Sequence, residues 1–183
     1  MVCFYSATSV DQVISEAGSS KGALFHHFSS KIDLAVQLVR RYVAADLAHL
    51  DAGLTATAHI TDPTVRVVAF LRHYEDGADE LMTEQTGCLY ATVLAERQLT
   101  GKEINDQVAK ATRVWRDAVA DLLRSALATR RLDTHIDVDA LADHLYTTFE
   151  GGFILCRTYN DRAAMRAQLR IYRQLIEAFL RAD

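Results

Sequence analysis

Residues 8–34 read TSVDQVISEAGSSKGALFHHFSSKIDL, a pattern that predicts a short helix, a tight turn and a second short helix. A hydroxyl at Thr8 or Ser9 can cap the first helix by accepting a hydrogen bond from a free backbone N–H. Gly18 can adopt a positive φ and end that helix at low steric cost, and either of the next two serines can cap the second helix. Two helices joined in this way form a helix-turn-helix, whose second helix enters the major groove of DNA.

The same stretch resembles the DNA-binding signature of the TetR family of bacterial transcriptional repressors. The resemblance covers residues 8–34 of the 183, and the rest of the chain is similar, through weaker motifs, to the family's helical ligand-binding and dimerisation domain. The matching positions are Thr8-Ser9-Val10, Glu16-Ala17-Gly18, Ser20-Lys21-Gly22, Leu24, Phe25-His26-His27-Phe28, Ser30-Lys31 and Leu34.

Half of the residues are hydrophobic, so a sizeable core is possible. The composition predicts an all-α protein, because the chain has one proline, few glycine clusters and much alanine, leucine and arginine. The resemblance implies a helix-turn-helix DNA-binding head in residues 1–50 and a helical ligand-binding and dimerisation bundle in residues 51–183. A helix is expected from near Lys31 to about Ala52, followed by a loop or a frayed helix end from Gly53 to Thr61. The pair Gly151-Gly152 lies inside an expected helix, where each Gly costs about 1 kcal/mol relative to Ala. We interpret the pair as a point where another helix passes close by.

The head is expected to be incomplete, because the family has a long first helix before this signature and only seven residues precede Thr8 here. Either the true start lies upstream or the chain is shortened. Without that helix, an inner apolar face loses its cover, at roughly 1.5–3 kcal/mol for each large side chain. The residues of that face are Val10, Val13, Leu24, Phe28 and Leu38.

The charge balance argues mildly against a nucleic-acid partner. The net charge is −4, and in residues 1–31 the two lysines, Lys21 and Lys31, are offset by Asp11 and Glu16. Phosphate neutralisation supplies most of the non-specific affinity for DNA. In the resembled family the first helix commonly carries basic residues, so its absence would also account for the missing positive charge.

Catalytic and metal-binding patterns are absent from the sequence. It contains no G-x-S-x-G, H-E-x-x-H or G-x-x-x-x-G-K pattern, so we expect neither an enzyme nor a cofactor. Cys3, Cys88 and Cys156 are too far apart to form a metal-ligand pair and indicate a reducing cytoplasm. The longest apolar runs are too short to cross a membrane.

The resemblance implies a set of DNA contacts on and beside the second helix. Lys21 can reach guanine O6 or N7, and the Ala23 methyl can touch a thymine methyl. Phe25 replaces a common Tyr and lacks its phosphate-binding hydroxyl, so it either packs on a sugar or thymine methyl or belongs to the core. His27 is either a phosphate contact or a core-edge histidine, and Lys31 is expected on a phosphate near a helix N-terminus. The full set is Ser20, Lys21, Gly22, Ala23, Phe25, His26, His27 and Lys31.

The body of the chain holds the aromatic and apolar residues expected of an effector pocket. In the resembled family the pocket lies inside this bundle and binds small, often hydrophobic molecules; such pockets also hold a few polar groups. For each residue the alternative is ordinary core packing. The ligand-binding candidates are Phe70, His73, Tyr74, Tyr90, Trp115, Tyr146 and Phe149, with Thr92, Glu96 and Gln107 as further polar groups.

These observations predict a dimeric, ligand-responsive transcriptional repressor. The resemblance implies that two copies pair through their last two helices and place two reading helices on a pseudo-palindromic double-stranded operator. A small, hydrophobic effector would release the DNA. The alternative is a small-molecule-binding or heterodimerising helical protein that has lost DNA binding together with the first helix.

Overall fold

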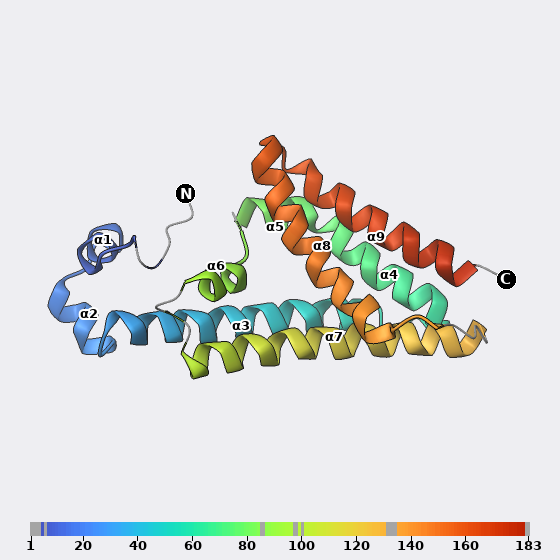
Figure 1. Cartoon of the computed structure of the whole chain (residues 1–183), viewed down its shortest axis with the longest axis horizontal. Helices are drawn as coiled ribbons and strands as arrows, with labels where there is room; N and C mark the ends of the chain where they lie inside the picture. Colours follow the sequence, from blue (N-terminus) through green and yellow to red (C-terminus); the bar gives the residue numbers. More distant parts are fainter. Residues whose placement is uncertain are drawn as a thin grey trace. The chain divides into compact units, whose positions relative to one another are not determined.

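The computed structural model describes residues 5, 7–84, 87–96, 99, 101–130 and 135–181 (Figure 1). Every regular element in these residues is an α-helix, which confirms the prediction of an all-α fold. In chain order the helices are α1 (Val10–Glu16), α2 (Lys21–His27), α3 (Lys31–Ala56), α4 (Pro63–Asp76), α5 (Ala78–Glu84), α6 (Leu89–Ala95), α7 (Lys102–Arg130), α8 (Val138–Tyr159) and α9 (Ala163–Arg181).

The helices are distributed over two compact units. Unit 1 is Met1–Asp46 with Cys88–Ala111, and so contains α1, α2, α6 and the first parts of α3 and α7. Unit 2 is Leu47–Gly87 with Thr112–Asp183 and contains the rest. The domain boundary expected at residue 50 stays a prediction.

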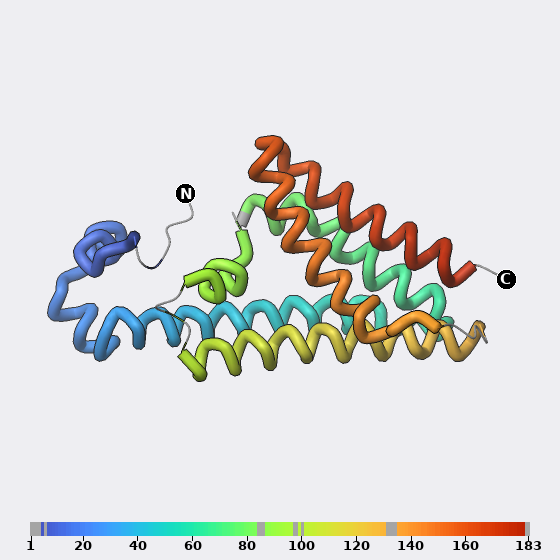
Figure 2. The backbone as a smooth tube through the Cα atoms, in the orientation of Figure 1, coloured from blue at the N-terminus to red at the C-terminus, as the bar shows by residue number. Residues whose placement is uncertain are grey.

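Helices α1 and α2 form the predicted helix-turn-helix (Figure 2). Their caps come from the expected residue types. Ser9 caps α1: its Oγ accepts from the Gln12 N–H at 3.1 Å, while Gln12 Oε1 accepts from the Ser9 N–H at 2.6 Å. This reciprocal pair is a capping box. Gly18 has φ +57° and makes the turn, and Ser20 caps α2 by accepting from the Ala23 N–H at 3.1 Å.

The inner face of the head is only partly covered. Neither α1 nor α2 contains a buried residue, and Val10, Val13, Leu24 and Phe28 are all half-buried. Leu38, expected on the same face, is 52% exposed. This face is therefore partly open to solvent within the described part of unit 1.

Helix α3 runs past the point where its end was expected. The prediction placed its end near Ala52, with a loop or a frayed helix end from Gly53, and the predicted helix end is wrong because α3 continues to Ala56. Gly53 serves close packing rather than a turn: the ring of Tyr74 lies against it, and an added Cβ would stand 2.9 Å from Tyr74 Cζ.

In unit 2, α8 and α9 lie side by side, and α4 packs on α9 (Figure 1). The largest fully buried side chains include Phe70, Leu123 and Met165. The close passage expected at the glycine pair is confirmed for Gly152, whose added Cβ would lie 3.5 Å from the Met165 Cα of α9. The shared core of α4, α8 and α9 thus fixes the frame that carries the aromatic residues discussed below.

Candidate nucleic-acid interface and effector site

Helix α2 presents most of its residues to solvent. Leu24 and Phe28 are half-buried, whereas the remaining residues of the helix are exposed, as is the cap Ser20. The exposed residues of α2 are Lys21, Gly22, Ala23, Phe25, His26 and His27. All of the DNA contacts expected on this helix are therefore accessible, and their roles stay predictions.

Two of the alternatives left open by the sequence concern aromatic residues. Phe25 is 44% exposed, so the interpretation of this residue as part of the core is wrong. His27 is also exposed, and its ring stands edge-on to that of His26 with the centroids 5.2 Å apart. Both residues can reach a ligand without any change in the core.

The two lysines of the head differ in their surroundings. Lys21 Nζ lies 3.8 Å from Asp11 Oδ1, and both side chains are exposed, so this pair contributes little to stability and leaves Lys21 free to move. Lys31 is half-buried: its ammonium donates to the Tyr5 carbonyl oxygen at 2.5 Å and lies 3.9 Å from the centre of the Tyr5 ring. A phosphate contact by Lys31 must therefore share or replace the contact with Tyr5.

The connection from α2 to α3 is held by one carboxylate. Asp33 Oδ2 accepts from the Ser29 N–H at 2.8 Å and from the Ser29 hydroxyl at 3.1 Å, while Ser30 Oγ accepts from the Asp33 N–H at 3.1 Å. The hydrogen bonds from Ser29 lower the pKa of the Asp33 carboxyl. The hydrogen bonds of Ser29 and Ser30 with Asp33 fix the direction in which α3 follows α2.

An aromatic cluster in unit 2 is centred on Tyr74 of α4. The Tyr74 ring centroid lies 5.1 Å from Phe70, 5.2 Å from His73, 5.3 Å from Trp115 and 6.1 Å from Phe149. The structure therefore brings five of the seven ligand-binding candidates together. Tyr146, a sixth, is half-buried on α8, the helix that also carries Phe149.

The sequence interpretation missed His49 as a member of this cluster. The His49 ring lies 5.1 Å from the Tyr74 ring, and the Tyr74 hydroxyl donates to the His49 carbonyl oxygen at 3.1 Å. The sequence holds one signal that could have indicated His49. Tyr42, Ala45 and His49 follow one another at helical spacing and therefore share one face of α3. This spacing does not show which residues that face contacts.

Tyr90 belongs to a different cluster, in unit 1. Its hydroxyl donates to Asp46 Oδ2 at 2.9 Å, and its ring meets that of Tyr42 at 5.0 Å between centroids. Burial raises the pKa of both hydroxyls, and the neighbouring Asp46 carboxylate raises it further. Tyr90 thus holds α6 on α3 within unit 1, and its part in effector binding stays a prediction.

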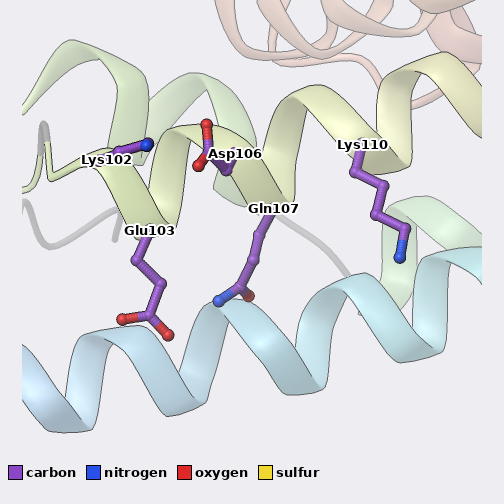
Figure 3. A pocket seen from close by; sticks show the side chains of 5 residues that line it. All are labelled: Lys102, Glu103, Asp106, Gln107 and Lys110. Carbon is purple, nitrogen blue, oxygen red and sulfur yellow. The ribbon is translucent and has the colours of Figure 1, made fainter.

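Gln107, one of the polar candidates, lines an open depression of about 460 Å³ at the start of α7. Glu103 and Gln107 extend from α7 toward α3 (Figure 3), where Glu103 pairs with Arg40. The other lining residues are Lys102, Asp106 and Lys110. This depression is open to solvent, unlike the enclosed pockets that bury most of a small hydrophobic molecule.

The other two polar candidates, Thr92 and Glu96, also lie in unit 1. The Thr92 hydroxyl donates to the Cys88 carbonyl oxygen of its own helix at 3.0 Å. Glu96 is buried at the end of α6. The part of Thr92 and Glu96 in effector binding stays a prediction.

Comparison with known proteins agrees with this geometry. Residues 5–38, which contain the helix-turn-helix, match the model described as "Bacterial regulatory proteins, tetR family". Residues 63–172 match the "Tetracyclin repressor-like, C-terminal domain". The chain belongs to the TetR family. This assignment makes it a DNA-binding transcriptional regulator rather than an enzyme, and dimerisation is a property of the family.

Two curated relatives of this TetR-family chain are transcription factors. It is 27% identical to the transcriptional regulator AcuR of Cereibacter sphaeroides over 155 residues, 82% of this chain and 67% of AcuR. It is 29% identical to the HTH-type transcriptional activator FasR of Mycolicibacterium smegmatis over 119 residues, 65% of this chain and 51% of FasR. The chain thus spans about two thirds of one relative and half of the other.

The fold of this TetR-family chain also matches solved structures. The crystal structure of the regulatory protein TetR from Rhodobacter sphaeroides gives a TM-score of 0.73 at 23% identity, with 93% of this chain and 88% of that chain covered. Within the described residues, no helix has the length and apolar character needed to cross a membrane.

Proposed function

We propose that this TetR-family chain is a dimeric repressor that binds a pseudo-palindromic duplex and is released by a small hydrophobic effector. The observation that carries the DNA-binding part is the exposure of α2 along its outward face, on a helix fixed by the Ser20 cap at one end and by the Ser29–Asp33 hydrogen bonds at the other. A rigid, exposed second helix is what entry into a major groove requires.

The outer faces of α8 and α9 support pairing with a second copy. On α9, the residues Ala164, Gln168, Ile171, Leu175 and Ala178 follow one another at alternating spacings of four and three residues. On α8 the same alternation relates Thr147, Gly151, Ile154 and Thr158.

Ile154 is 66% exposed and Leu175 is 58% exposed, while the opposite side of each helix carries its buried residues, such as Leu145 and Leu180. A repeat averaging 3.5 residues is the spacing by which helices pack on one another. We call the α9 residues Ala164, Gln168, Ile171, Leu175 and Ala178, together with the α8 residues Thr147, Gly151, Ile154 and Thr158, the outer seam. Four helices, two from each copy, would bury it.

The Tyr74 cluster supports the effector part of the proposal. Tyr74 lies among five rings, and the next residue of α4, Glu75, binds Arg173 of α9, a helix of the outer seam. A hydrophobic molecule that enters between the rings and binds one arrangement of α4 more tightly would shift the population toward that arrangement. The resulting change in DNA affinity can be no larger than the ratio of the effector's affinities for the two arrangements of α4.

A second candidate function follows from the thin cover of the head. Helices α1 and α2 contain no buried residue, and in residues 1–31 the two lysines are offset by two acidic residues. A head that is weakly packed and has no net positive charge there would have little affinity for phosphates. The chain would then act as an effector-binding or heterodimerising protein without DNA affinity. The two functions differ in one property that can be measured directly, namely sequence-specific binding to a duplex.

Selection of bound DNA from a pool of random duplexes tests the proposal. We expect enrichment of an inverted repeat whose half-sites are centred about 10–10.5 base pairs, or a multiple of that, apart. Failure to enrich any sequence would favour the second candidate. Deleting the gene should then raise transcription from promoters that carry the selected repeat, whereas a fall would make the protein an activator, as FasR is described to be.

Lys31→Ala is expected to lower affinity about equally for all DNA sequences and to reduce the salt slope by about one unit, since one phosphate contact is lost. Fluorescence anisotropy at a series of salt concentrations measures this slope. Lys21→Ala is the matched comparison, because a lysine that reads a base should relax preference at one base pair. If Lys31→Ala leaves the salt slope unchanged, the Lys31 ammonium contacts Tyr5 and makes no phosphate contact.

A further inference from the structure

The two adjacent glycines of α8 have opposite surroundings. A Cβ added to Gly152 would meet the Met165 side chain and backbone of α9, whereas a Cβ added to Gly151 would meet nothing within 4 Å. The absence of a side chain at Gly152 is explained by packing within the chain. No contact among the described residues explains the glycine at position 151.

Glycine is unfavourable in the middle of a helix relative to alanine, because it gives up more conformational freedom on folding. Gly151 nevertheless lies well inside α8, which runs from Val138 to Tyr159. It occupies a position of the outer seam, between Thr147 and Ile154. A glycine at this position has no side chain to hold another helix backbone at a distance.

We propose that Gly151 is the point of closest approach between α8 and a helix of a second copy of this chain. The inference rests on the proposed pairing through the outer seam and adds where the two copies touch most closely. Exposed Ile154 and Leu175 supply the apolar area around the crossing, and the missing side chain lets the two backbones come together, as small residues do at helix crossings.

The test is the dissociation constant of the dimer, measured by sedimentation velocity over a range of concentrations. Gly151→Leu is expected to raise this constant about tenfold or more, because added bulk at a close crossing overpacks the interface. Gly151→Ala should have a smaller effect in the same direction. Both changes improve helix propensity, so circular dichroism of the diluted protein should show helix content at least equal to that of the wild type.

Two further variants separate the outcomes. Thr147→Leu adds the same side chain one turn earlier on the outer seam and should leave the dissociation constant unchanged or lower it; an equal weakening by both leucines would overturn the crossing point. Leu175→Asp should give a monomer. If Leu175→Asp is a monomer while Gly151→Leu dimerises as tightly as the wild type, the proposed crossing at Gly151 is wrong, whereas pairing through the outer seam is supported. If Leu175→Asp also dimerises, both proposals fail.

Discussion

Glu75→Ala should destabilise unit 2 by about 1.5–3 kcal/mol, because it removes the buried carboxylate that accepts from Arg173 Nε and leaves this arginine paired with Glu177, whose Oε2 lies 3.0 Å from Arg173 Nη1. Glu75 Oε2 accepts from Arg173 Nε at 2.6 Å, and Glu75 Oε1 accepts from Arg170 Nε at 2.8 Å. The Glu75 and Arg173 side chains are 7% and 8% exposed. This pair ties α4 to α9 across the interior of the unit, where water cannot replace the lost partner.

Urea unfolding at neutral pH measures this effect. Asp121→Ala is the matched control, because Asp121 pairs with Arg124 at 3.3 Å on an exposed surface and such pairs contribute at most about 1 kcal/mol. A loss of stability no larger than that of the control would show that the Glu75 network is not a structural tie.

The same pair predicts a dependence of stability on pH. Burial raises the pKa of the Glu75 carboxyl, but the hydrogen bonds and charges of Arg173 and Arg170 outweigh burial and lower it overall. A lowered pKa in the folded state stabilises the fold above the pKa of the unfolded chain, and this stabilisation is lost as the pH falls. The difference in stability between the wild type and Glu75→Ala should therefore shrink below about pH 4.

Leu175→Asp should convert the dimer into a monomer and lower affinity for the selected inverted repeat by about 100-fold or more, since binding of two linked half-sites gains roughly 10²–10⁴ over one. An aspartate at this point of the outer seam would have to lose water without gaining a partner. Val65→Asp places the same charge on an exposed apolar position of α4 and should leave both properties unchanged. A dimer that persists in Leu175→Asp would contradict pairing through α8 and α9.

Local sequence signals were enough to predict the reading head. Ser9, Gly18 and Ser20 act within three or four residues of themselves, so their cap and turn roles follow from residue type and spacing alone. Asp62-Pro63 starts α4 for the same reason, with Asp62 Oδ1 accepting from the Thr64 N–H at 2.8 Å. Features of this kind do not depend on how distant parts of the chain pack.

Features that depend on distant contacts could not be predicted in this way. Gly53 looks like a helix end in the sequence, and only the Tyr74 ring of another helix explains why it lies inside α3. The Glu75–Arg173 pair joins residues 98 positions apart, a separation that no helical period encodes. Phe25 was left between core and surface because exposure depends on what covers a helix, not on the helix itself.

The candidate site was predicted unevenly for the same reason. The candidate residues on α2 could be grouped from the sequence because they share one short helix, whereas their exposure depends on what covers that helix. Lys31 was placed correctly at the start of α3, but its contact with Tyr5 crosses 26 residues. Tyr90 was named as a ligand-binding candidate on aromatic character alone, and residue type did not show that its ring meets that of Tyr42.

The central claim is that α2 enters the major groove of a duplex, and chemical protection of the selected DNA tests it most directly. Dimethyl sulfate methylates guanine at N7, an atom that lies in the major groove. We expect the wild-type chain to protect guanine N7 in two clusters about one helical turn apart on the same side of the duplex. Binding that leaves guanine N7 in both half-sites fully reactive would contradict the account.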